Sequence, residues 1–129
     1  MILQKQYVLR RALHGTRSRR SSCFFFFVGG YTKFNGLKSY NKNLKTLIAI
    51  GGWNEGSSRF SKLVADEDRR SAFVKNVVKF LRLNNFDGLD LDWEYPAFRD
   101  GSKAADKENY AALVKVSRVN TLRVRCISY

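Results

Sequence analysis

Three acidic side chains stand at alternate positions near the middle of the chain: Asp90, Asp92 and Glu94. Alternate side chains of an extended segment point to the same face, so these acids would share one face of a strand. Neighbouring carboxylates about 6.6 Å apart along that face are close enough for their titrations to couple. Such a cluster is typical of acid and base catalysis or of metal binding. The spacing therefore predicts an active-site strand.

Two other interpretations of these acids have to be weighed. A strand face exposed to water can be acidic without a function, but here the opposite face carries two leucines and Trp93, which favours packing against helices. Pro96 would end the strand just beyond the last acid. A calcium loop of the EF-hand type needs glycine at its sixth position, where Tyr95 stands. We therefore predict no metal site and place the acids at the C-terminal end of a strand.

The segments around the acids alternate between strand and helix patterns. Residues 44–52 and 86–95 are expected to be strands, and residues 32–43 a short helix or loop. Residues 66–83 are expected to form a helix, and a further helix is expected to begin near Asp106. Strands alternating with helices predict βα units and a parallel sheet.

The helix over residues 66–83 is indicated by its ends and its apolar face. Asp66 can cap it, and Glu67 and Asp68 complement the positive end of the helix dipole. Its core-facing stripe has helical spacing and consists of Phe73, Val74, Val77, Val78 and Leu81.

The first expected strand ends in Gly51, Gly52 and Trp53. Paired glycines permit close backbone approach, which suits a rim that faces a substrate, although a plain turn explains them as well. Trp53 could stack on a sugar ring or could instead be buried under a loop.

The ten residues 87–96 read D-G-L-D-L-D-W-E-Y-P, and this segment resembles the signature of family 18 glycoside hydrolases, the chitinases, in their animal and especially insect form. Residues 47–53 resemble the family's preceding barrel strand, with Ala49 where a serine is usual. The resemblance runs from about Gly29 to Val116. It implies an α/β fold, an incomplete (β/α)8 TIM barrel with about two βα units around the third and fourth barrel strands.

The resemblance also implies a mechanism in which the N-acetyl group of the substrate is the nucleophile. Glu94 would be the general acid and would later activate water. Asp92 would orient the acetamido group, and Asp90 would share a proton with Asp92. Non-hydrolytic relatives typically replace the acid at the position of Glu94, so the motif is of the hydrolytic type.

The remaining motif positions are assigned to binding and to structure. Asp87 has the opposite side-chain parity to the acids and, with Gly88, is expected to be structural. No metal or organic cofactor is expected. The expected ligand is chitin or a chitooligosaccharide, contacted by Trp53, Tyr95, Gly51 and Gly52.

The 129 residues carry 24 basic and 11 acidic side chains, a net charge of +13. Residues 29–116 hold 15 of the basic and all 11 acidic residues, so this predicted partial catalytic domain has a net charge of +4. The excess lies in a basic N-terminal tail, residues 1–28, and in a divergent C-terminal tail, residues 117–129. We expect both tails to come from a truncated or mispredicted gene product.

Basic tails of this kind could also bind nucleic acid or an anionic membrane. No aromatic interleaving or zinc spacing accompanies the arginines, so neither partner is expected. The apolar run of residues 23–28 is too short for a signal peptide, and residues 1–22 resemble a mitochondrial presequence only in composition. An extracellular location is implied by the family resemblance alone.

A complete (β/α)8 barrel typically needs about 250 residues, so we expect a truncated and inactive fragment of a chitinase. The alternative is a non-catalytic chitin-binding or carbohydrate-binding protein of the same family. A basic nucleic-acid-binding peptide ranks third. The sequence leaves the oligomeric state open.

Overall fold

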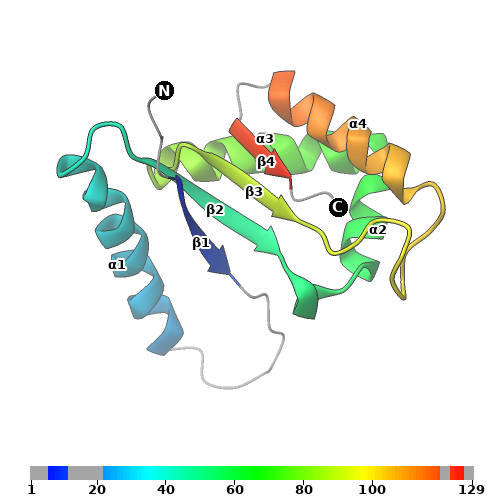
Figure 1. Cartoon of the computed structure of the whole chain (residues 1–129), viewed down its shortest axis with the longest axis horizontal. Coiled ribbons are helices and arrows are strands. Elements are labelled where there is room, and N and C mark those ends of the chain that lie inside the picture. The colour runs from blue at the N-terminus through cyan, green and yellow to red at the C-terminus, as the bar shows by residue number, and fades with distance from the viewer. Residues whose placement is uncertain (1–5, 12–21, 120–122, 127–129) are drawn as a thin grey trace.

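The computed structural model describes residues 6–11, 22–119 and 123–126, with side chains for residues 29–119. Its strands form one parallel sheet in the order β1-β2-β3-β4. The strands are β1 (Gln6–Arg11), β2 (Lys45–Gly51), β3 (Gly88–Asp92) and β4 (Arg123–Cys126). All four arrows point the same way in Figure 1, so the C-terminal ends of the strands share one edge.

Between these strands, the described residues form four α-helices, of which the second and third both lie between β2 and β3: α1 (Ser22–Gly36), α2 (Ser58–Val64), α3 (Glu67–Leu83) and α4 (Asp106–Val119). Two short 3-10 helices, η1 (Leu37–Ser39) and η2 (Trp53–Glu55), flank β2. In Figure 1, α2, α3 and α4 gather on one side of the sheet, and α1 lies apart from them. The predicted α/β class is confirmed. No helix in the described part of the chain is long and apolar enough to cross a membrane.

The predicted helix over residues 66–83 is confirmed as α3. The carboxylate of Asp66 accepts a hydrogen bond from the backbone N–H of Arg69 at 2.8 Å, which satisfies a free donor of the first turn. The stripe faces inward: Val74, Val77 and Leu81 are buried, and Phe73 and Val78 pack against the same core. The expected helix near Asp106 is also confirmed, as α4.

The second predicted strand is shorter than expected: β3 covers residues 88–92, whereas the sequence pattern predicts residues 86–95. At its start, the N–H of Phe86 still bonds to the carbonyl of Leu81 at 2.9 Å and so belongs to the end of α3. At its end, the carbonyl of Asp92 accepts from Gly52 N–H at 2.7 Å, and the chain then leaves the sheet. Glu94 therefore lies in the loop beyond the strand.

The sheet is also wider than the two strands that the sequence predicts. The additional strands β1 and β4 lie in the segments assigned to the basic tails. Their pairing joins segments far apart in the chain, which a local hydrophobic pattern does not reveal. Side chains of residues 1–28 and 120–129 lie outside the described ones, so the expected origin of the tails and the expectation that they bind neither nucleic acid nor a membrane stay predictions.

A polar cluster joins α1, β2 and β3 at the N-terminal edge of the sheet. The carboxylate of Asp87 accepts from the backbone N–H of Thr46 at 2.8 Å and pairs with the Lys38 ammonium at 2.9 Å. The Thr46 hydroxyl donates to Asn35, whose amide donates to the carbonyl of Asn84 at 2.7 Å. Asp87 thus lies at the opposite end of β3 from Asp92, among groups that fix the elements to one another.

These contacts predict a pH dependence of stability. Burial alone would raise the pKa of Asp87, but the Thr46 hydrogen bonds and Lys38 outweigh it and lower the pKa below its ordinary value of 3.8. A depressed pKa stabilises the fold fully above 3.8, and this contribution is lost as the pH falls through the folded-state pKa. We expect Asp87→Asn to cost about 1 to 2 kcal/mol at pH 6. The difference from wild type in urea unfolding should shrink below pH 3.8.

The exposed Asp100 supplies the control for this experiment. Asp100→Asn should leave the urea midpoint unchanged at every pH. Parallel pH profiles for wild type and Asp87→Asn would contradict the role given to the Asp87 cluster.

Candidate active site

The two aspartates of β3 are buried in the sheet. Asp90 and Asp92 are each 1% exposed. The strand register sets them beside the small residues Ala49 and Gly51 of β2. Leu89 and its alternate neighbours pack into the core under the helices, so by alternation the aspartates point to the other face of the sheet. The predicted shared face is thus formed by the two aspartates within the strand.

Glu94 follows at the C-terminal rim and is half-buried. The residue before it, Trp93, is fully buried and fixes this part of the chain. Its ring stacks on Phe60 at 5.1 Å between centroids and meets Tyr110 edge-on at 5.5 Å. Its indole N–H donates to the hydroxyl of Ser57 at 2.9 Å. Glu94 therefore follows directly on a residue that is anchored in the core.

Gly51 and Gly52 make the close backbone approach that the sequence suggests. Both have positive φ, 111° and 96°, a region of backbone conformation that residues other than glycine rarely adopt. A Cβ at Gly51 would lie 2.2 Å from the carbonyl oxygen of Asp92. The group that Gly51 approaches is the backbone of β3. The two glycines therefore bring the end of β2 close to Asp92.

This packing predicts a strong effect of Gly51→Ala. The new methyl group would overlap the Asp92 carbonyl and would strain the backbone, so we expect a loss of at least about 2 kcal/mol in the free energy of unfolding. Gly56→Ala is the matched control, since Gly56 also has positive φ, 68°, but open space around it. Urea unfolding followed by circular dichroism separates the overlap from backbone strain. Equal losses in the two variants would contradict the contact with Asp92.

Trp53 stands on the same rim, in η2, with 59% of its surface exposed. The alternative of a tryptophan buried under a loop is therefore wrong for Trp53. The guanidinium carbon of Arg99 lies 3.9 Å from the centroid of its ring. Tyr95 is half-buried, and its carbonyl accepts hydrogen bonds from Ser57 and Ser102 at 3.5 and 3.3 Å.

Several polar residues that support the rim were not singled out from the sequence. The hydroxyl of Ser61 donates to the carboxylate of Asp106 at 3.1 Å, and both side chains are buried. Asp106 also accepts from the backbone N–H of Lys103 at 2.7 Å. Together with Ser57, these bonds tie the loop after β3 to α2. Serines in a polar segment give no periodic signal, and the sequence pattern indicates Asp106 only as the start of a helix.

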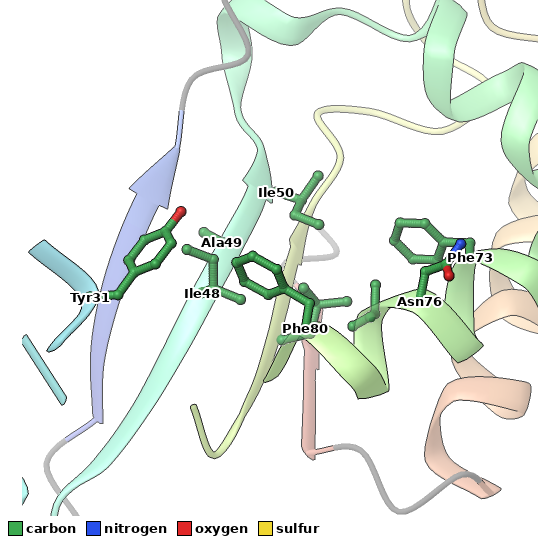
Figure 2. A pocket seen from close by; sticks show the side chains of 9 residues that line it. Tyr31, Ile48, Ala49, Ile50, Phe73, Asn76 and Phe80 are labelled. Carbon is green, nitrogen blue, oxygen red and sulfur yellow. The ribbon is translucent and has the colours of Figure 1, made fainter. Parts of the chain in front are cut away.

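An apolar pocket lies away from this rim. Its volume is about 320 Å³, and it lies between α1, β2 and α3. Figure 2 shows its lining residues, among them Tyr31, Ile48 and Phe80. These side chains lie on the helix-covered side of the sheet, away from the face to which Asp90 points. In the described part of the chain, no three His, Cys, Asp or Glu side chains gather closely enough to hold a metal ion. The acidic strand and its rim are therefore the candidate site.

A parallel sheet with helices along it and a candidate site at the C-terminal ends of its strands is the arrangement of (β/α)-barrel enzymes. The comparisons with known proteins then fix the family. The family model of glycosyl hydrolases family 18 matches residues 7–122, and the chain belongs to this family.

Curated relatives and solved structures agree with this assignment. Probable chitinase 2 of Drosophila melanogaster is 57% identical over 90 residues, 70% of this chain and 18% of the relative. Oviduct-specific glycoprotein of Ovis aries is 47% identical over 85 residues, 66% of this chain and 16% of the relative. The Group IV chitinase of Ostrinia furnacalis, solved with allosamidin, has a TM-score of 0.74 and 36% identity over 83% of this chain and 30% of that chain.

The chain thus spans less than a fifth of the curated relatives and under a third of this solved enzyme. The chitinase structures confirm the prediction of a partial TIM barrel. The family match extends on both sides beyond the expected region of about residues 29–116. The division into two tails and a partial domain stays a prediction.

Proposed function

We propose that the protein to which this chain belongs hydrolyses β-1,4-linked N-acetylglucosamine polymers. The observation that carries the proposal is the carboxylate of Glu94 at the rim, directly after the buried aspartates of β3. Family membership, the chitinase relative and the chitinase structure with allosamidin support it. An extracellular location is proposed with it, on family membership alone.

The proposed mechanism is substrate-assisted and retains the anomeric configuration. Glu94 protonates the glycosidic oxygen as the bond to the anomeric carbon breaks, while the carbonyl oxygen of the substrate's acetamido group attacks that carbon. Asp92 orients the acetamido group and stabilises the positive charge that it gains. Asp90 shares a proton with Asp92. Glu94 then takes a proton from the water that opens the cyclic intermediate.

The rim supplies the proposed sugar contacts. The exposed indole of Trp53 offers a flat apolar face on which a sugar ring can stack. Tyr95 lies next to Glu94 and is a second proposed contact. Gly51 and Gly52 keep side chains out of the space beside Asp92, since a Cβ at Gly52 would lie 3.7 Å from its carboxylate. Asp87 and Gly88, at the other end of β3, are given a structural role only.

We further infer that the 129-residue chain binds chitooligosaccharides without efficient turnover. It corresponds to 30% of the Ostrinia furnacalis chitinase, and a barrel active site is built from loops that follow several strands. These residues supply the acid and one rim of the cleft.

The second candidate is a carbohydrate-binding protein without catalytic activity. It is favoured by the 47% identity to oviduct-specific glycoprotein, whose name is not that of an enzyme. Both candidates bind sugar, so only hydrolysis separates them.

The experiment is a graft of residues 29–116 into the Drosophila chitinase relative, in place of its matching segment. We expect the graft to release product from a chitooligosaccharide. A folded graft that binds the sugar without cleaving it would contradict the hydrolytic function and support the second candidate.

A further inference from the structure

The side chain of Arg99 connects the two loops that form the rim. Arg99 lies in the loop after β3 and is half-buried. One of its guanidinium nitrogens, Nη1, donates to the backbone carbonyl of Trp53 and, at 3.1 Å, to that of Glu94. The guanidinium also lies over the ring of Trp53, with its carbon 3.9 Å from the ring centroid. One side chain thus contacts both the exposed aromatic and the proposed acid.

We propose that Arg99 is a positioning residue of the rim, one that sets the orientation of Trp53 relative to Glu94. This inference rests on the proposed function. The guanidinium occupies one face of the indole, while 59% of the Trp53 surface stays exposed, so the opposite face is left for a sugar ring. The two carbonyl bonds hold the loop of η2 at a fixed distance from the loop of Glu94. A bound oligosaccharide would then contact the Trp53 ring and the Glu94 carboxylate with a fixed spacing between the two contacts.

The chemistry requires arginine at this position. The planar guanidinium can stack on an indole and donate in its own plane at the same time. A lysine ammonium has no plane to stack and would retain only part of the contacts. We therefore expect Arg99→Lys to lie between wild type and Arg99→Ala in every measurement below.

The first measurement is acrylamide quenching of tryptophan fluorescence in the full 129-residue chain without ligand. The chain has two tryptophans, and Trp93 is fully buried, so acrylamide reports on Trp53. Removing the guanidinium from one face of the ring should raise the quenching constant of Arg99→Ala by at most about 1.7-fold, because 59% of the Trp53 surface is already exposed. The control is Arg82→Ala, because Arg82 is exposed in the last turn of α3, which leads into the opposite end of β3. Equal quenching in Arg99→Ala and wild type would overturn the proposal.

The second measurement titrates chitopentaose against the same proteins. Wild type and Arg82→Ala should show protection of Trp53 by the sugar, and Arg99→Ala should bind about two- to fivefold more weakly. Tighter binding by Arg99→Ala would overturn the proposal, since Arg99 would then block the sugar face of the ring. Weaker binding with unchanged quenching would also overturn it, because Arg99 would contact the sugar directly.

The two measurements separate this proposal from the function on which it rests. If chitopentaose does not protect Trp53 in wild type, the rim of this chain does not bind the sugar. The claim that Arg99 sets the position of a bound sugar is then wrong as well. The quenching result still decides whether Arg99 holds the ring.

Discussion

Replacing Glu94 by glutamine in the grafted chitinase is expected to lower kcat/KM for an unactivated chitooligosaccharide by at least about 100-fold. Glutamine keeps the size and polarity of the side chain but has no proton to give to the leaving oxygen. The residues around it should stay in place, because Trp93 and the loop carbonyls, and not the Glu94 carboxylate, make the contacts that fix the rim. Binding of the sugar should therefore change much less than its cleavage.

The matched control is Glu108→Gln, the same substitution at an exposed acid in the first turn of α4. It should leave kcat/KM and sugar affinity unchanged. Similar losses in both variants would show a general effect of charge, and an active Glu94→Gln graft would remove Glu94 from the role of general acid.

Trp93→Ala should cost about 3 to 5 kcal/mol in the free energy of unfolding of the 129-residue chain. The indole is fully buried, stacks on Phe60, meets Tyr110 edge-on and donates to Ser57. Removing it leaves a cavity in the core and takes from the buried Ser57 hydroxyl the hydrogen bond that the indole N–H donates. Since domains are stable by only about 5 to 15 kcal/mol, this variant should be largely unfolded in mild urea, as followed by far-ultraviolet circular dichroism.

The second tryptophan of the chain provides the comparison. Trp53→Ala removes an exposed ring, so its free energy of unfolding in urea should stay within about 0.5 kcal/mol of the wild-type value. Its affinity for chitopentaose should fall instead. A loss of stability in Trp53→Ala as large as that in Trp93→Ala would contradict the assignment of one ring to the core and the other to the rim.

The parts of the fold that the sequence predicted are those with local signals. The helix α3 follows from the cap at Asp66 and the 3.6-residue spacing of its apolar stripe. The strand β2 follows from its apolar run. The motif of residues 87–96 located the candidate site, because alternate acids at the end of a buried strand are uncommon without a function.

The parts that could not be predicted depend on contacts between distant segments. The strands β1 and β4 exist through pairing with β2 and β3, and their basic composition hid them. At the end of β3, the Asp92 carbonyl bonds to Gly52, 40 residues away in the chain, and no local pattern predicts that the strand ends there. Arg99 has no periodic or motif signal, and its role comes into view only when Trp53 and Glu94 are placed beside it.

The most direct test of the central claim, that Glu94 protonates the leaving oxygen, compares two substrates in the graft and in its Glu94→Gln variant. One is an unactivated chitooligosaccharide, whose leaving group needs a proton. The other is a dinitrophenyl chitobioside, whose leaving group departs without one. A general acid predicts that the loss in kcat/KM is at least about tenfold larger for the unactivated substrate. Equal losses on both substrates would contradict the account.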